Sequence, residues 1–278
     1  MPATISPVRT SAERALDAVL RLGPAVFSLA FTALGIETLI YARVSTHALG
    51  PLYNVIPVIP WLPAIPWVIP WVIPGVAYAF GLILVFAAAG LLSKRTARTA
   101  GMTLGGLLFL CTLVLEVPKN AVNLGSMSLR TGVFEPLALA CLAWLAPGPG
   151  VTPDWLARAS RYLLALSLIV FGVDHFLALD PIASLIPAWI PWRVFWVAFF
   201  GATFIASGLS IAFHWLLRAG AAGLGTMFAI WVFTLHLPRV LGLYGIPGAP
   251  TNPDEWSSLF IAIGLWGGLW ALARAGSR

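Results

Sequence analysis

Seven ionisable side chains interrupt stretches of the chain that are otherwise apolar, and they are the residues best suited to chemistry: Glu37, Glu116, Lys119, Asp174, His175, His236 and Arg239. A charged group at the centre of a membrane-spanning helix costs about 2.5 to 3.5 kcal/mol, so such groups mark functional sites or paired networks. With both histidines neutral, the three acids exceed the two fixed bases by one charge. Protonation of one imidazole near neutral pH would balance that charge. The set therefore predicts a site for a proton or a small polar ligand.

The same residues also allow a purely structural interpretation. Glu116 and Lys119, like His236 and Arg239, lie three positions apart, which is the spacing of neighbours on one helix face. A proline in each of these two motifs leaves backbone groups that polar side chains could satisfy. A network of this kind would hold helices together without binding a ligand.

A metal site is the weaker interpretation of these residues. Asp174, His175 and His236, with Glu37 or Glu116, offer nitrogen and oxygen ligands that suit a transition metal. Adjacent residues on a helix point about 100° apart, so Asp174 and His175 do not readily face one ion. The sequence has no HExxH or ExxH pattern. No metal is predicted.

The elements that carry these residues follow from composition. Of 278 residues, 60% are hydrophobic and 9% are charged, against about 25% charged in soluble domains. This excludes a soluble enzyme and a disordered chain, and it predicts an integral membrane protein in contact with the lipid bilayer. Two cysteines without CxxC spacing exclude a disulfide scaffold and a zinc ribbon. Spanning helices need about 20 apolar residues, and an all-α fold with eight of them is expected, at residues 24–43, 72–93, 100–118, 131–148, 161–179, 193–213, 219–238 and 256–273.

The distribution of basic residues predicts the orientation in the membrane. Eleven lysines and arginines lie at the boundaries on the side of the N-terminus, and five lie at the opposite boundaries. The positive-inside rule then predicts that both termini lie in the cytoplasm. The basic residues that set this orientation explain the net charge of +6, so the charge does not indicate nucleic-acid binding. The candidate residues lie towards the ends of odd-numbered spans, so they should share one depth near the extracytoplasmic face. Thr10 and Glu13 predict a capping box for a short amphipathic helix ending near Arg21, on the cytoplasmic surface.

The sequence also contains a weak internal repeat. A shift of 120 residues places LEVPK at 115–119 on LHLPR at 235–239, and a shift of 137 places LGIE at 34–37 on FGVD at 171–174. Four crossings return the chain to its starting side, so two four-helix bundles of the same orientation are expected, residues 1–150 and 151–278. A run rich in Pro and Trp, residues 55–74, lengthens the first half. It should lie along the extracytoplasmic interface and not form a regular helix.

Motifs of the second half resemble a known family. FGVDHF at 171–176, IPAWIP at 186–191 and LHLPR at 235–239 are similar to motifs of the DoxX-like family of small four-helix bacterial membrane proteins. The resemblance covers about residues 160–275, and the first half looks like a diverged second copy. It implies a multi-pass protein of the bacterial inner membrane, related to subunits of thiosulfate to quinone oxidoreductase and of other redox complexes. It also implies that Asp174, His175, His236 and Arg239 form the site.

These observations predict a redox-associated membrane protein that binds a quinone, or a small thiol or sulfur compound, at the outer leaflet. Such a protein would act as an oxidoreductase subunit beside other membrane or redox-complex subunits. No cofactor-binding motif supports a redox centre in the chain itself, so its own catalysis stays open. Two alternatives also stay open. A polar cluster between repeats suits a small-molecule or proton-linked transporter, and the many Trp and small residues suit a structural subunit of a larger complex.

Overall fold

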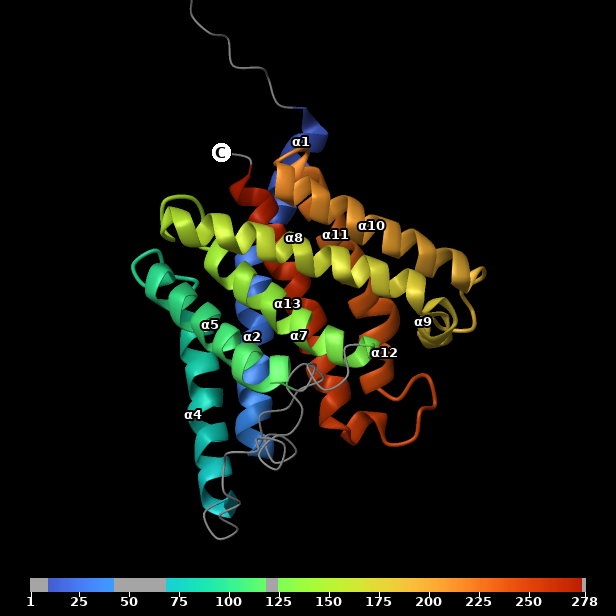
Figure 1. The fold of residues 1–278 in the computed structure, drawn as a ribbon, viewed down its shortest axis with the longest axis horizontal. Helices are drawn as coiled ribbons and strands as arrows, with labels where there is room; N and C mark the ends of the chain where they lie inside the picture. Colours follow the sequence, from blue (N-terminus) through green and yellow to red (C-terminus); the bar gives the residue numbers. More distant parts are fainter. Residues whose placement is uncertain (1–9, 43–68, 119–124, 277–278) are drawn as a thin grey trace, which may run out of the picture.

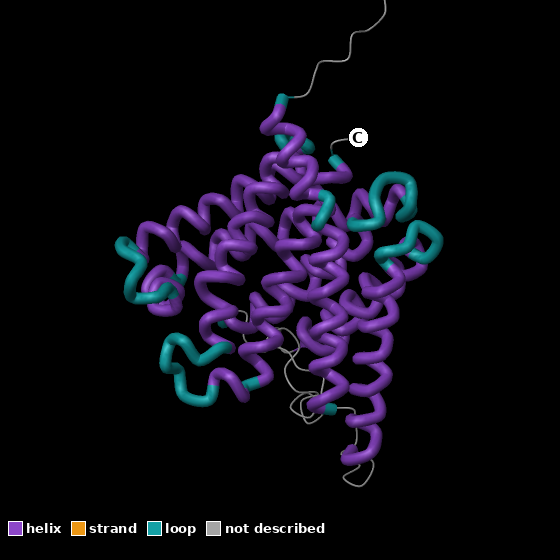
Figure 2. Tube along the Cα trace, turned by 180° about the vertical axis from the view of Figure 1, so that it is seen from behind, coloured by secondary structure: helices purple, strands orange, loops and turns teal. Residues whose placement is uncertain are grey.

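The computed structural model describes residues 10–42, 69–118 and 125–276, and the regular elements of these ranges are helices (Figure 1, Figure 2). In chain order they are α1 (Ser11–Leu20), α2 (Gly23–Tyr41), α4 (Ile69–Gly90), α5 (Ala97–Cys111), the π-helix η2 (Thr112–Glu116), α7 (Met127–Leu145), α8 (Asp154–Leu177), α9 (Leu179–Leu185), α10 (Arg193–Phe213), α11 (Leu217–Trp231), the π-helix η3 (Val232–His236), α12 (Leu237–Val240), the 3₁₀-helix η4 (Ala249–Thr251) and α13 (Pro253–Ala275).

The helices have the length and composition of an integral membrane protein. Each predicted span falls on a helix, but six helices in the described ranges, and not eight, are long and apolar enough to cross a membrane. Of the other two, α4 contributes a shorter apolar helix, Gly75–Gly90, and α7 has its apolar stretch interrupted by Arg130 and Glu135. The six are Ser11–Tyr41, Ala97–Glu116, Asp154–Leu177, Arg193–Phe213, Leu217–Val240 and Pro253–Ala275.

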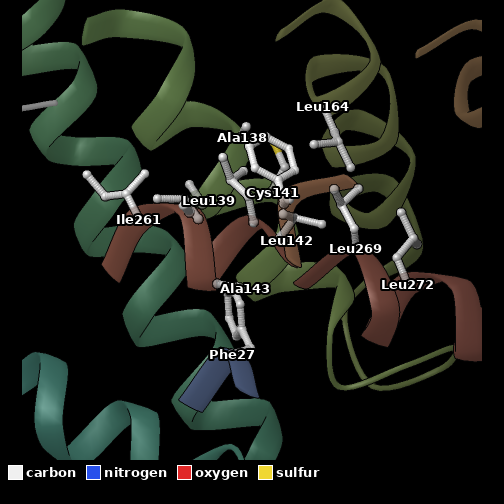
Figure 3. Close-up of a cluster of buried hydrophobic side chains, with 14 of the residues drawn as sticks. Phe27, Ala138, Leu139, Cys141, Leu142, Ala143, Leu164, Ile261, Leu269 and Leu272 are labelled. Carbon is white, nitrogen blue, oxygen red and sulfur yellow. The ribbon is translucent and has the colours of Figure 1, made fainter. Parts of the chain in front are cut away.

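The core is built around α7 and α13. Residues 138–143 of α7 are all at most 2% exposed, so this part of the helix is enclosed on every side and not only along one stripe. Figure 3 shows side chains of α7 and α13 meeting Phe27 of α2 and Leu164 of α8. Cys141 is a free thiol fully buried in this cluster. The peripheral helices thus pack around two apolar helices at the centre.

The last helix of each half packs against the first helix of the other half. In Figure 1, α13 lies along α2 and α7 lies along α8, in agreement with their close contacts. A Cβ atom on Gly267 would overlap the backbone of Phe27, and one on Gly23 would overlap the backbone nitrogen of Ala271, so glycine is what allows these backbones to approach. The two halves therefore share one core. Each fourth helix packs against the first helix of the other half, which was not predicted from the sequence.

Within each half, the first two helices cross at a pair of glycines. Gly35 of α2 faces Gly81 of α4, and Gly172 of α8 faces Gly201 of α10. A Cβ atom on Gly35 or Gly172 would lie 2.8 or 2.6 Å from the facing carbonyl oxygen, so neither crossing has room for a side chain. The candidate acid follows the crossing glycine by two residues in both halves. The same packing therefore positions both acids.

The predicted capping box of α1 is confirmed. The Thr10 hydroxyl oxygen accepts from the Glu13 backbone N–H at 3.2 Å, the Glu13 carboxylate accepts from the Thr10 N–H at 2.8 Å, and Arg21 is the C-cap. An ion pair of 2.6 Å from Asp17 to Arg218 holds α1 against the start of α11. Figure 1 and Figure 2 show α1 beside the C-terminal end of α13, which it also contacts. The two ends of the described chain therefore lie together.

One local prediction was wrong, and one short helix was not predicted. α4 begins at Ile69, within the run predicted not to form a regular helix; Pro70 falls in the first turn, where no intrahelical N–H is required. The rest of that run, residues 55–68, lies outside the described residues. In the second half, α9 forms a short helix in the connection between α8 and α10, where none was predicted from the sequence.

Candidate functional site

Two candidate residues end π-helical turns at equivalent places in the two halves. η2 ends at Glu116 and η3 ends at His236, and the five-residue turns lie 120 positions apart. After each turn, the next backbone N–H donates to the carbonyl five residues earlier. The cause is Pro118 or Pro238, because a proline has no N–H and its ring crowds the carbonyl four residues before it, so the turn widens. This distortion, which was not predicted from the sequence, positions both residues.

Glu116 lies in a carboxylate-rich part of the first half. It is 4% exposed, and its carboxylate is close enough to Glu135 of α7 and Cys111 of α5 to act on both electrostatically. Lys119, its predicted neighbour, lies outside the described residues. At the positions 120 residues later, the second half has His236, which is half-buried, and Glu255. The two halves thus place different titratable groups on the same scaffold.

Asp174 is paired with an arginine that was not among the predicted site residues. Its Oδ1 accepts from Arg130 Nε at 2.9 Å and from the terminal nitrogen Nη2 at 2.5 Å, which joins α8 to α7. Arg130 also donates to the carbonyl of Gly125 at 3.1 Å. Asp174 is 3% exposed, and within the described residues its Oδ2 has no donor. One oxygen of this carboxylate is therefore fixed by the arginine and the other is buried.

His175 faces away from that ion pair. Its Nδ1 lies 2.7 Å from the Phe171 carbonyl oxygen, so Nδ1 carries the proton of the neutral ring and Nε2 is an acceptor. The ring stacks on Trp231 with centroids 6.2 Å apart and lies 5.1 Å from the ring of Phe204. Asp174 therefore meets α7 while His175 packs among aromatic side chains of α10 and α11, as expected for adjacent positions on a helix.

Arg239, like Asp174, forms an ion pair that joins two helices. Its Nε donates to Glu255 Oε2 at 2.9 Å and its Nη2 to Glu255 Oε1 at 2.6 Å, a bidentate arrangement that fixes both groups. The pair joins α12 to the first turn of α13. Both side chains keep about a fifth of their surface, 21% and 18%. Arg239 thus holds α13 in place, and its hydrogen-bond donors Nε and Nη2 are used in this pair.

Glu37 lies in the wall of a pocket. The pocket has a volume of about 330 Å³ between α2 and α13, and Glu37 itself is 5% exposed. Its Oε1 accepts from the Ser257 hydroxyl of α13 at 2.8 Å. The remaining lining is apolar and aromatic: Ala33, Ile36, Ile40, Tyr41, Trp256 and Phe260. A buried carboxylate thus forms an acidic wall of a mostly apolar cavity.

The pocket wall is fixed on one side and open on the other. Trp256 donates its indole N–H to the Pro250 carbonyl at 2.9 Å and its ring contacts Phe260. Ile36 and Ile40 are 46% and 70% exposed on the outer face of α2. An exposed apolar face of α2 therefore lies beside the pocket.

The candidate residues that the structure describes, which were predicted to lie at one depth in the membrane, form local pairs and not one cluster. Within the described ranges, no three His, Cys, Asp or Glu side chains gather in a way that could hold a metal ion. The partners that were not predicted from the sequence are Arg130, Glu255 and Ser257, and all three lie in the first turns of the fourth helices or close to them. The repeat offered one signal, because Glu135 and Glu255 lie 120 positions apart in the fourth helices of the two halves.

The comparisons with known proteins add no family. No family model matches the chain, and neither a curated protein nor a solved structure does.

Proposed function

We propose that this integral membrane protein binds an amphipathic small molecule with a hydroxylated aromatic head, of the quinol class, in the pocket at Glu37. The observation that carries the proposal is the position of a buried carboxylate in a pocket of about 330 Å³ beside the exposed apolar face of α2. Ligand pockets are mostly apolar, with a few polar groups that fix orientation. The quinol hydroxyl would donate to the carboxylate, and Trp256 and Phe260 would cover the ring.

The proposed ligand class explains why the protein would be associated with a redox complex. A quinol carries two electrons and two protons, so a protein that holds it beside a redox partner would serve an oxidoreductase complex without a cofactor of its own. The DoxX-like motifs of the second half support this part, since the resemblance implies relatives in such complexes. The bacterial inner membrane and the cytoplasmic position of both termini belong to the same proposal.

Internal duplication is also part of the proposal, and three pairs of features support it. The π-helical turns lie 120 positions apart. The crossing glycines have offsets of 137 on the first helices and 120 on the second helices, the same offsets that align the sequence motifs. Finally, Gly105 and Gly225, 120 positions apart, each pack against a tryptophan of the fourth helix. Independent features with shared offsets favour a common origin of the halves.

Native mass spectrometry of gently extracted protein tests the proposal. The wild-type chain should retain a lipid-soluble aromatic ligand, or take up added ubiquinol-1, at one molecule per chain. Glu37→Gln, which keeps the size of the side chain and removes its charge, should lose most of that occupancy. Asp174→Asn is the matched control, because Asp174 occupies the equivalent position but does not line the pocket. Equal occupancy in wild type and Glu37→Gln would contradict the proposal.

A structural subunit is the second candidate, and a different observation favours it. The ion pairs Arg130 with Asp174 and Arg239 with Glu255 are formed inside the chain, so these groups stabilise the helix packing without any ligand. In this case the protein should co-purify with a stoichiometric partner, and Glu37→Gln should leave that association unchanged. Loss of ligand with retention of the partner would separate the two functions.

A further inference from the structure

A second cavity lies at the corner between α9 and the start of α10. Its volume is about 820 Å³, and it is lined by Asp180, Ala183 and Ser184 of α9 and by residues 192–195. None of these residues lines the pocket at Glu37. The sequence pattern assigned them no chemical role, and α9 itself was not predicted.

Two opposite charges face this cavity without neutralising each other. Asp180 and Arg193 both line it, and in the part of the chain that the structure describes neither one forms an ion pair. Both side chains are exposed. The cavity therefore presents one anion and one cation that are not paired with each other, as binding of a molecule that carries both charges requires.

The position of the cavity along the chain indicates the level of the lipid head groups. The chain leaves the apolar helix α8 at Leu177 and enters α10 at Arg193. Between them, Trp189 and Trp192 are 67% and 78% exposed. Exposed indoles at the ends of spanning helices favour the membrane–water interface. A ligand at this corner would therefore have its polar part at head-group depth.

We infer that this cavity binds a zwitterionic phospholipid whose head group bears a primary ammonium. The guanidinium of Arg193 would hold the phosphate, for which its fork of N–H donors is suited. The carboxylate of Asp180 would accept from the ammonium. Val194 and Phe195 would contact the apolar part of the lipid next to the head group.

The charges select among lipid classes. The head group of phosphatidylglycerol would satisfy Arg193 with its phosphate but would offer Asp180 only neutral hydroxyls and no positive charge. A quaternary ammonium, as in a choline head group, has no N–H to donate to Asp180. Ser184 already donates its hydroxyl to the Pro181 carbonyl at 2.6 Å, so its oxygen can only accept, which again suits an ammonium donor. A head group with both a phosphate and a primary ammonium therefore complements all three side chains, the phosphate at Arg193 and the ammonium at Asp180 and Ser184.

Competition between lipids on the purified chain tests this assignment without any variant. Detergent-solubilised protein is titrated with palmitoyl-oleoyl phosphatidylethanolamine, phosphatidylglycerol or phosphatidylcholine, and the bound lipid is counted by native mass spectrometry. We expect phosphatidylethanolamine to bind about tenfold more tightly than the other two, since only it completes both charged contacts. Equal binding of the three lipids would overturn the assignment.

Variants then locate the lipid. Asp180→Asn and Arg193→Gln should each weaken phosphatidylethanolamine binding about tenfold, and Asp180→Asn should also abolish the preference over phosphatidylglycerol. The matched controls are Asp154→Asn and Arg158→Gln, an exposed acid and base at the other end of α8. Monodisperse elution of every variant shows that it is folded. If the lipid preference survives both site variants, or falls equally in the controls, the cavity is not the lipid site.

Discussion

Replacing Arg130 by Met should strongly destabilise the protein, because it leaves a buried carboxylate without its partner. The Asp174 side chain is 5% exposed, and its Oδ1 accepts two charge-assisted hydrogen bonds from Arg130. Such bonds contribute about 1.5 to 3 kcal/mol each, and breaking one side of a buried ion pair costs about 3 to 5 kcal/mol. Arg130 keeps 22% of its surface, so solvent relieves part of the cost. We expect the free energy of unfolding to fall by about 3 kcal/mol.

Reversible unfolding in mixed micelles with increasing SDS, followed by tryptophan fluorescence, measures this change. Arg239→Met should cost about half as much, because Glu255 retains 18% exposure and stays partly solvated. Arg158→Met, at an exposed position, should change stability by less than about 0.5 kcal/mol. The double variant Arg130→Met with Asp174→Leu should be more stable than Arg130→Met alone, because no buried charge remains. An effect of Arg130→Met no larger than that of Arg158→Met would refute the reasoning.

Other substitutions test the packing, the cap and one titration. Gly267→Ala places a methyl group on the backbone of Phe27 and should cost about 2 kcal/mol in the same unfolding assay, whereas Gly106→Ala, which meets open space, should be neutral or slightly stabilising. Thr10→Ala removes the capping hydroxyl and should destabilise α1 by about 1 kcal/mol, seen as faster proteolysis within α1 and unchanged proteolysis elsewhere. Burial, and then the positive charge of Arg161, lower the pKa of His214 below its ordinary value of 6.5. Because the unfolded chain binds the proton more readily, this contribution to stability is present above pH 6.5 and is lost as the pH falls below it. Arg161→Gln should raise the pKa of His214 in an NMR titration, and no change would remove Arg161 as a cause.

Local signals in the sequence predicted the features that depend on neighbouring residues. Thr10 and Glu13 are three positions apart, so their capping box could be read without knowing the fold. The positions of the helices followed from apolar stretches of sufficient length. The separation of Asp174 from His175 followed from the 100° step between adjacent helical residues. In each case the interacting groups lie within one turn of each other.

Features that depend on contacts between distant helices were not predicted. Arg130 was counted as a boundary residue, yet α7 places it on Asp174, 44 positions away. Ser257 hydrogen-bonds Glu37 across 220 positions, and nothing in either segment identifies the other. The packing of each fourth helix against the other half was not predicted for the same reason, since composition does not say which helices come into contact. The π-helical turns had a local cause in Pro118 and Pro238, but these prolines were interpreted only as sources of free backbone groups.

Binding of ubiquinol-1 to the purified protein tests the central proposal most directly. The dissociation constant should be measured for wild type, Glu37→Gln and Asp174→Asn in the same detergent. We expect Glu37→Gln to bind about tenfold more weakly, since it loses one charge-assisted hydrogen bond, and we expect Asp174→Asn to bind like wild type because it lies outside the pocket. Wild-type affinity in Glu37→Gln, or equal losses in both variants, would contradict a ligand site at Glu37.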